Sequence, residues 1–193
     1  MGVQGVFSMN DLYINSYKAT AKELVSLSVY NVGYQLCDAG YQWGPGIRDH
    51  YLIHYIISGK GTYEVHHEVH SLSAGDAFLV YPNTEVIYRA DAKNPWEYAW
   101  VGFTGSDAAT ILQATDFSRK NPCIHAVPNG EEVKRQLLHI YDARGNEFEH
   151  AVEMTGRLYT MLAMFLHGAS HTTEQNSANS YVQKGIEYIS SNY

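Results

Sequence analysis

Alternating aromatic residues mark one short run near the middle of the chain, where every second position holds Trp96, Tyr98 or Trp100. On a β-strand this spacing places the three rings on one face. A wall of rings can cover the C–H faces of a small polyhydroxylated molecule, while a few polar groups fix its hydroxyls. A packed core strand has the same pattern. The run therefore predicts either a binding wall or a core.

Arg48 is the main polar candidate to accompany such a wall. Its guanidinium offers a rigid fork of donors, which suits the neighbouring hydroxyls of a sugar as well as a carboxylate. The alternative is an ion pair with Asp49 or with another acid. Trp100 would stack on a sugar ring, and its alternative is packing in the core. Tyr88 and Tyr98 would add hydroxyl tips, although the chain has 16 tyrosines and the residue type alone is not specific.

The segment that must hold these residues, from Ser28 to about Thr104, has the pattern of β-structure. Short apolar or alternating runs are separated by turns such as 59–61, Gly-Lys-Gly, which supplies the positive φ of a tight reversal. Seven or eight strands at this spacing indicate a barrel or a sandwich. The Gly- and Pro-rich segment 38–46 is expected to be a loop without regular structure.

Beyond Gly105 the apolar pattern changes to a period of 3.6 residues, which predicts helices over 106–115, 129–143 and 147–167. The last helix has two overlapping apolar stripes. They form either one wide buried face or two faces, one on the barrel and one on the helix of a twin subunit. Leu158→Glu is expected to separate the subunits of such a dimer. One stripe consists of Phe148, Val152, Tyr159, Leu162 and Leu166. The other consists of Ala151, Met154, Leu158, Met161 and Phe165.

Composition limits the partners of this chain. The net charge is −7, from 20 acidic and 13 basic residues, and no long run of Lys and Arg occurs, so the chain is not expected to grip nucleic acid itself. The absence of an apolar run of about 18 residues and of a signal-peptide pattern predicts a cytoplasmic protein without membrane contact. Cys37 and Cys123 form no metal or redox pattern and are expected to be free thiols.

Three spaced segments carry a family resemblance: GPGIRDHYLIHYIISGKGTY at 44–63, LSAGDAFLVYPNTEVIYRAD at 72–91 and PWEYAWVGFTG at 95–105. Together with the helices and the final YVQKGIEYISSNY, they resemble sugar-responsive transcription regulators of the AraC/XylS family, in particular the raffinose-, melibiose- and arabinose-type members. The resemblance implies an N-terminal cupin-like barrel that binds an effector and a helical pair that dimerises. It also implies a C-terminal domain with two helix-turn-helix units that binds DNA.

The resemblance also implies site residues. The family's sugar-contacting Arg precedes the first long strand, where Arg48 stands, and its sugar-contacting Tyr follows the Pro turn, where Tyr88 stands. The last pair is His-x-Trp in the arabinose-type member and Tyr98-Ala99-Trp100 here. This departure adds length at the first position, so the bound sugar can differ. From a looser alignment, Tyr34 and Trp43 are further expected lining residues.

A metal-dependent cupin enzyme, such as an isomerase or dioxygenase, is the main alternative. It would need His-x-His, a Glu a few residues on, and a third His after a Gly-to-Pro turn. Here His50 and His54 are too far apart for that motif, and Ile87 and Tyr88 stand where the third His would fall. We therefore expect no catalytic metal and no cofactor, while a two-ligand metal site at His50 and His54 stays open. A barrel that binds nothing is the other alternative, and it would be filled with Val, Ile and Leu instead of Arg, His and Tyr.

The sequence thus predicts an α+β fold, in which a cupin-like β-barrel of the jelly-roll type is followed by two or three α-helices. The expected function is a non-enzymatic sensor of a mono- or oligosaccharide. It would form a homodimer through the Glu147–His167 helix and contact DNA only through a C-terminal domain. The expected parts are an arm (1–25), the barrel (26–105), a helical dimerisation region (106–167), a linker (168–180) and the start of a truncated helix-turn-helix domain (181–193).

Overall fold

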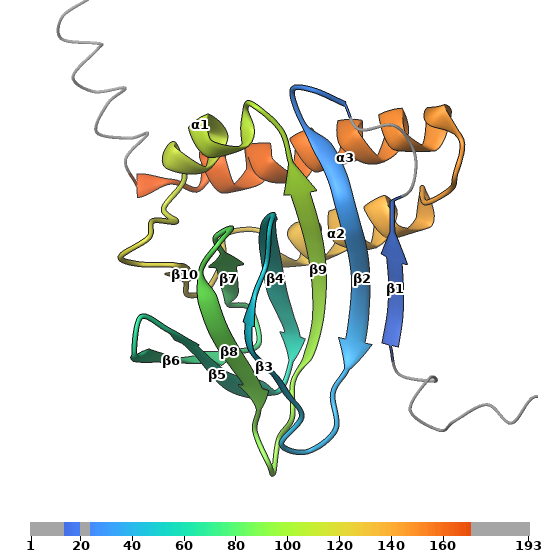
Figure 1. The fold of residues 1–193 in the computed structure, drawn as a ribbon. Helices are drawn as coiled ribbons and strands as arrows, with labels where there is room; N and C mark the ends of the chain where they lie inside the picture. The colour runs from blue at the N-terminus through green and yellow to red at the C-terminus, as the bar shows by residue number, and fades with distance from the viewer. Residues whose placement is uncertain (1–13, 20–23, 171–193) are drawn as a thin grey trace, which may run out of the picture.

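The computed structural model describes residues 14–19 and 24–170 (Figure 1). Within them, three helices follow or flank a set of short strands. The helices are α1 (Ala108–Gln113), α2 (Gly130–Asp142) and α3 (Phe148–His167). The strands are β1 (Ile14–Lys18), β2 (Ser28–Leu36), β3 (Gln42–Ile47), β4 (Tyr51–Ser58), β5 (Lys60–Val65), β6 (Glu68–Ser73), β7 (Ala77–Val80), β8 (Glu85–Ala90), β9 (Glu97–Thr104) and β10 (Cys123–Ile124).

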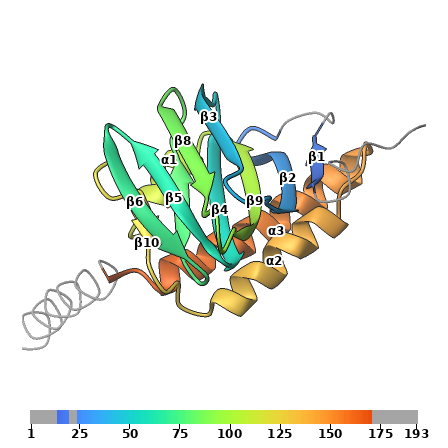
Figure 2. The same ribbon diagram turned by 90° about the horizontal axis from the view of Figure 1, so that it is seen from below.

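The strands form two sheets that face each other. One sheet has six strands in the order β1-β2-β9-β4-β7-β10, and the other has four in the order β3-β8-β5-β6. Neighbouring strands are antiparallel. Figure 2 shows the four-stranded sheet on one side of the six-stranded sheet and helices α2 and α3 on the other side. This arrangement confirms the predicted fold, a cupin-like pair of sheets followed by helices.

The six-stranded sheet separates two cores, because successive side chains of a strand point to opposite faces. We call the cluster between the sheets the barrel-side core and the cluster under the helices the helix-side core. On β9, Tyr98 and Trp100 belong to the barrel-side core, while Ala99 and Val101 belong to the helix-side core. Trp96, just before β9, joins Tyr98 and Trp100. The predicted placement of these three rings on one face is confirmed.

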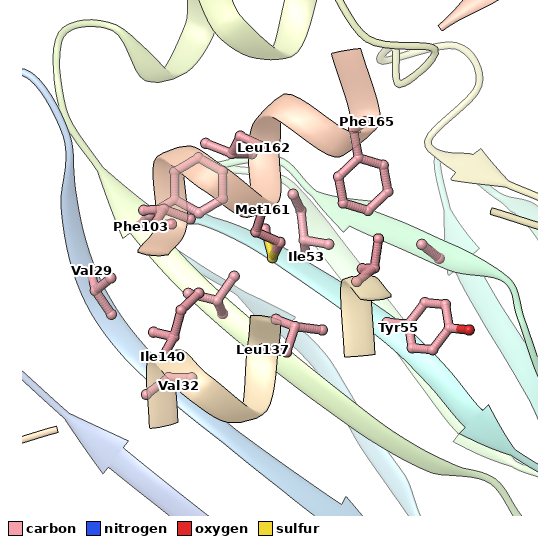
Figure 3. Close-up of a cluster of buried hydrophobic side chains, with 14 of the residues drawn as sticks. Val29, Val32, Ile53, Tyr55, Phe103, Leu137, Ile140, Met161, Leu162 and Phe165 are labelled. Atoms are coloured by element: carbon pink, nitrogen blue, oxygen red, sulfur yellow. The ribbon is translucent and has the colours of Figure 1, made fainter. Parts of the chain in front are cut away.

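The helix-side core is built from aliphatic and a few aromatic side chains of the six-stranded sheet and of the three helices. On α3 it uses the stripe that contains Leu158, whose side chain is 0 % exposed. The Leu158→Glu change would therefore unfold the core instead of testing a dimer contact, and that expectation is corrected. Figure 3 shows the core with Val29, Val32, Ile53, Tyr55, Phe103, Leu137, Ile140, Met161, Leu162 and Phe165 labelled.

The other stripe of α3 is left largely open. Phe148 is 57 % exposed, and Val152 and Tyr159 are also exposed, whereas Leu162 is buried. The two stripes therefore do not form one wide buried face. An apolar row runs along the outside of the helix instead.

The expected loop at 38–46 is wrong in part, because Gln42–Ile47 forms strand β3 and pairs with β8. Glycine and proline are tolerated there since β3 lies at the edge of its sheet and needs only one neighbour. The register shifts between Trp43 and Gly46, and Gly44 adopts a φ of 94°. An irregular edge strand of this kind has the composition of a loop.

The ends of the chain lie mostly outside the described residues. Of the predicted arm, residues 14–18 form the edge strand β1, which pairs with β2. The predicted linker beyond residue 170 and the predicted DNA-binding start at 181–193 fall outside the described part. Within the described ranges, no helix combines the length and the apolar character needed to cross a membrane. Cys37 and Cys123 are both buried free thiols, as expected.

Candidate functional site

Four of the predicted site residues line one cavity of about 250 Å³ between the two sheets. Tyr98 and Trp100 come from β9, Tyr88 comes from β8 of the opposite sheet, and Arg48 lies between β3 and β4. The pairing of β4 with β9 and the packing of the sheets bring these distant segments together. The placement of the residues was predicted, and their role in binding stays a prediction.

The cavity has an exposed rim and a buried end. Strand β1 provides part of the rim, where Ile14, Ser16 and Lys18 are all exposed. Because β1 pairs only with β2, the rim belongs to the edge of the six-stranded sheet. The buried end is formed by Leu52, His54, Tyr88 and Tyr98, each almost without exposed surface.

The Arg48 guanidinium lies between aromatic groups and not beside an acid. Its Cζ atom sits 4.0 Å from the centre of the Trp43 ring, and Nη2 donates to the Tyr88 hydroxyl at 3.5 Å. Asp49, the expected alternative partner, is 2.7 Å from His50 Nδ1 instead. Among the described residues, Arg48 forms no salt bridge and its buried Nε atom has no hydrogen-bond partner. The cation is therefore available to a polar ligand.

Trp43 supports this arrangement without lining the cavity. Its ring stacks on Tyr88 with the centres 5.1 Å apart and an angle of 13° between the planes, and Arg48 covers it. A guanidinium over an indole face is held by cation–π attraction. Trp43, predicted as a lining residue, thus lies behind Arg48 and fixes its direction.

Trp100 forms a side wall of the cavity at a place where β2 leaves room for it. An added Cβ on Gly33 would lie 2.5 Å from the Trp100 ring, so only glycine lets the indole lie flat against β2. The ring is half-buried and meets Tyr98 at 72°, with the centres 5.8 Å apart. The Tyr98 hydroxyl donates to Gln35 Oε1 at 3.2 Å. An indole face held in this way can stack on the C–H side of a sugar.

Two cationic side chains, Arg48 and Lys18, line the cavity together with buried groups whose pKa values are shifted. Burial raises the pKa of Tyr88 to about 12, although the Arg48 hydrogen bond acts in the opposite direction. Burial likewise raises the pKa of Tyr98. Burial, with a smaller effect of the Arg48 charge, holds the pKa of His54 well below its ordinary value. The side chains lining this cavity include no carboxylate in the described part of the chain.

Tyr34 does not join the others. It packs against Tyr141 of α2, with the ring centres 5.3 Å apart, and belongs to the helix-side core. Its neighbour Gln35 lines the cavity instead. Adjacent residues of β2 point to opposite faces of the sheet, and the looser alignment that suggested Tyr34 did not determine its face. We therefore leave Tyr34 out of the site.

The structure adds Asn31, Gln35 and His54 to the cavity lining. His54 follows His50 by four residues, and the sequence left this pair open as a two-ligand metal site. In the structure both ring nitrogens of His50 have hydrogen-bond partners: Nδ1 pairs with Asp49 Oδ1, and Nε2 lies 3.3 Å from Asn31 Nδ2. In residues 14–19 and 24–170, no three His, Cys, Asp or Glu side chains lie together in a way that could hold a metal ion.

Comparison with known proteins gives a consistent result. A family model described as the AraC-like ligand binding domain matches residues 28–162. The Msm operon regulatory protein of Streptococcus mutans is 34% identical over 185 residues, covering 93% of this chain and 66% of that protein. The raffinose operon transcriptional regulatory protein RafR of Pediococcus pentosaceus is 29% identical over 180 residues, covering 87% and 65%. The chain thus spans just under two thirds of the length of these relatives.

Among solved structures, similarity is found to a RmlC-like cupin family protein of Methanocaldococcus jannaschii with a double-stranded β-helix fold. It is 17% identical, with a TM-score of 0.40, and the match covers 57% of this chain and 99% of that one.

Proposed function

The chain belongs to the family of AraC-like ligand-binding domains, and on that premise we propose that its cavity binds a sugar effector for a transcription regulator. The observation that carries the proposal is the convergence of Arg48, Tyr88, Tyr98 and Trp100 on one cavity. A guanidinium and phenol tips can bond to neighbouring hydroxyls, while an indole covers a C–H face. Two relatives are named as regulators of the raffinose and Msm operons, which supports a saccharide as the effector.

In this proposal the chain is a sensor and not an enzyme. Sugar binding favours one arrangement of the regulator over another and can shift that equilibrium only by its differential affinity, by about 1–3 kcal/mol in typical cases. The arm is the natural element to respond, since β1 provides the rim of the cavity. Deletion of residues 1–25 should therefore change sugar affinity and inducibility, and unchanged values of both would remove the arm from the mechanism.

The exposed stripe of α3 is the surface proposed for a second copy of this chain. Phe148, Val152 and Tyr159 are spaced by four and seven residues, which is the spacing of a helix–helix seam. Val152→Glu should shift the sedimentation coefficient to that of a monomer. Thr160→Glu, on another exposed side of the same helix, is the matched control. A dimer that survives Val152→Glu would place the interface elsewhere.

Contact with DNA belongs, in this proposal, to a C-terminal domain of the regulator whose first helix is similar to residues 181–193. The acidic balance of the present chain, with a net charge of −7, supports this division between sensing and DNA binding.

A thermal-shift screen with mono-, di- and trisaccharides, divalent metals and organic acids tests the proposal, followed by calorimetry on the sugars that stabilise. A ligand that binds only the folded state raises the midpoint of unfolding, by an amount that grows with the logarithm of its concentration above Kd. Stabilisation by a saccharide without added metal is expected. Stabilisation by metals alone would overturn the proposal and favour a metal-dependent enzyme.

A further inference from the structure

His54 is a buried polar group that the fold itself leaves without a hydrogen-bond partner. Its ring is 1 % exposed at the buried end of the cavity, and within the described residues its Nδ1 atom has no partner. Aromatic rings enclose it: Phe78 is stacked at 4.4 Å, and Tyr98 and Tyr88 each have their centres 5.0 Å away. An apolar ring would pack in this position without the cost of desolvating a nitrogen.

The contrast with His50, which lies just before β4, shows that the fold can provide partners for a buried imidazole. His50 is also buried, yet Asp49 bonds to Nδ1 and Asn31 to Nε2. His54 has no such neighbours in the described part of the chain, although it lines a cavity that His50 does not line. Arg48 in the same cavity also has a buried nitrogen, Nε, without a partner there. A bound ligand could supply the missing hydrogen-bond partner to both nitrogen atoms.

The protonation state of His54 limits the chemistry of that partner. Burial first, and the Arg48 charge second, hold its pKa well below the ordinary value, so the ring is neutral. A neutral imidazole has one N–H donor and one acceptor lone pair. A hydroxyl group matches it, because a hydroxyl can both donate and accept. An ionised carboxylate or phosphate oxygen can only accept, so it could use the N–H donor but would leave the acceptor nitrogen unmatched.

The size of the cavity limits how much of a saccharide reaches His54. Its volume of about 250 Å³ lies below the roughly 300–1,000 Å³ of pockets that enclose drug-sized ligands, so it accommodates about one sugar ring. Among the described residues that line the cavity, the exposed ones are Ile14, Ser16 and Lys18 of β1, whereas His54 is buried. Further units of an oligosaccharide must therefore leave the cavity along this rim.

From these observations we infer that His54 is an effector-contacting residue, which bonds one hydroxyl of a single sugar ring at the buried end, with further sugar units at the rim beside β1. The inference rests on the proposed function and adds to it the residue that contacts the sugar ring at the buried end of the cavity. It also separates the two ends of the site, since the buried end selects the ring and the rim tolerates what is attached to it.

Calorimetry with D-galactose, its four monodeoxy analogues, melibiose and raffinose tests the inference on the full chain and on His54→Phe. In the unaltered chain, one monodeoxy sugar should bind about tenfold more weakly than galactose, because one hydrogen bond is lost. His54→Phe should weaken galactose by a similar factor and bind that deoxy sugar as well as it binds galactose. Melibiose and raffinose should lose the same factor as galactose, since the contact lies in their shared terminal ring.

A thermal measurement without sugar separates this role from a structural one. His54→Phe should leave the midpoint of unfolding unchanged or raise it, because an unpartnered nitrogen is replaced by an apolar ring that packs on Phe78. His54→Asn and His54→Gln, which place a polar atom near Nδ1 or Nε2, should restore part of the discrimination against the deoxy sugar. If His54→Phe does not fold, the comparison of these two variants with the unaltered chain still tests the contact.

His70→Phe is the matched control. Its Nε2 atom is also buried without a partner in the described residues, but His70 does not line the cavity. It should leave the deoxy-sugar profile unchanged. Failure of the unaltered chain to bind any saccharide would count against the proposed function itself. Normal sugar binding with an identical deoxy profile in His54→Phe would overturn only the role of His54.

Discussion

The two faces of the six-stranded sheet use the same strands for different purposes. The helix-side core is filled by aliphatic side chains such as Ile53, Val101 and Leu158 and is closed by α2 and α3. The barrel-side core combines aliphatic side chains with a larger share of rings, among them Phe78 and Trp96, and borders the cavity. Alternation along β4 and β9 is enough to separate the two chemistries. One face of a sheet can therefore be specialised for binding while the other holds the fold together.

The difference extends to hydrogen bonding, although the buried Thr155 on α3 also has an Oγ1 atom without a partner in the described residues. Three residues that line the cavity carry a buried polar atom without a partner in the described part of the chain: Asn31 Oδ1, Arg48 Nε and His54 Nδ1. Each such atom costs stability, because the hydration lost on folding is not replaced. The barrel-side core thus retains groups that weaken the unliganded fold, and the helix-side core has to offset them. Substitutions in the helix-side core should therefore lower stability and leave sugar affinity unchanged. Substitutions around the cavity should lower sugar affinity and change stability little.

Leu158→Ala should have the largest effect on stability. Removing a fully buried leucine leaves a void under α3 and typically costs about 2–5 kcal/mol of unfolding free energy. Urea unfolding measures this loss, and calorimetry at a temperature where the variant is folded should give an unchanged sugar affinity. Tyr159→Ala on the exposed stripe is the control with a smaller loss. A fall in affinity for Leu158→Ala would show that the two cores are coupled.

Trp100→Ala and Arg48→Ala should have the reverse signature. Each is expected to weaken sugar binding by about 1–3 kcal/mol, through loss of stacking or of charged hydrogen bonds, while the midpoint of unfolding changes little. Trp43→Ala should weaken binding less than Arg48→Ala, since Trp43 only supports the guanidinium from behind. Native affinity in both Trp100→Ala and Arg48→Ala would end the assignment of the cavity as the sugar site.

The sequence predicted which rings share the barrel-side face, but it did not predict every residue that lines the cavity. Period-two alternation is sufficient to place Trp96, Tyr98 and Trp100 together, and the family resemblance located Arg48 and Tyr88. Tyr34 was misplaced because adjacent residues on β2 face opposite cores, and side-chain type does not determine which face is which. His54 was not identified as a contact because its signal is a missing partner, and that can be seen only when all of its neighbours are known.

The helices show the same limit. Two overlapping stripes on α3 were visible, but which one meets the sheet depends on the rotation of the helix, and that is fixed by its packing on β2 and α2. The edge strand β3 was missed for a different reason. Its irregular pairing tolerates Gly44 and Pro45, so that its composition is that of a loop.

The smallest predicted effect is a difference in pH dependence between the two cores. Burial lowers the pKa of His54, and of His50 in part, below the ordinary value of 6.5, so the unfolded chain takes up protons before the folded chain does. Stability should therefore fall as the pH drops below 6.5, by at most about 1.4 kcal/mol per pH unit for one histidine. Arg48, Tyr88 and Tyr98 face the His54 ring, and of these only Arg48 is charged in this window.

His54→Gln should make this slope shallower between pH 7 and pH 5, whereas Leu158→Ala should lower stability at every pH without changing the slope. Urea unfolding at several pH values measures both. This pH window avoids the titration of Asp76. Burial raises the pKa of Asp76, but backbone hydrogen bonds and His125 outweigh it and lower the pKa overall. Asp76 therefore contributes stability above about pH 4 and loses this contribution only at lower pH. An equal slope in His54→Gln and the unaltered chain would mean that His54 is protonated as readily in the folded state as in the unfolded one. The His54 ring would then be open to water. The buried end of the cavity would not be the closed, ring-lined site that distinguishes the barrel-side core from the helix-side core.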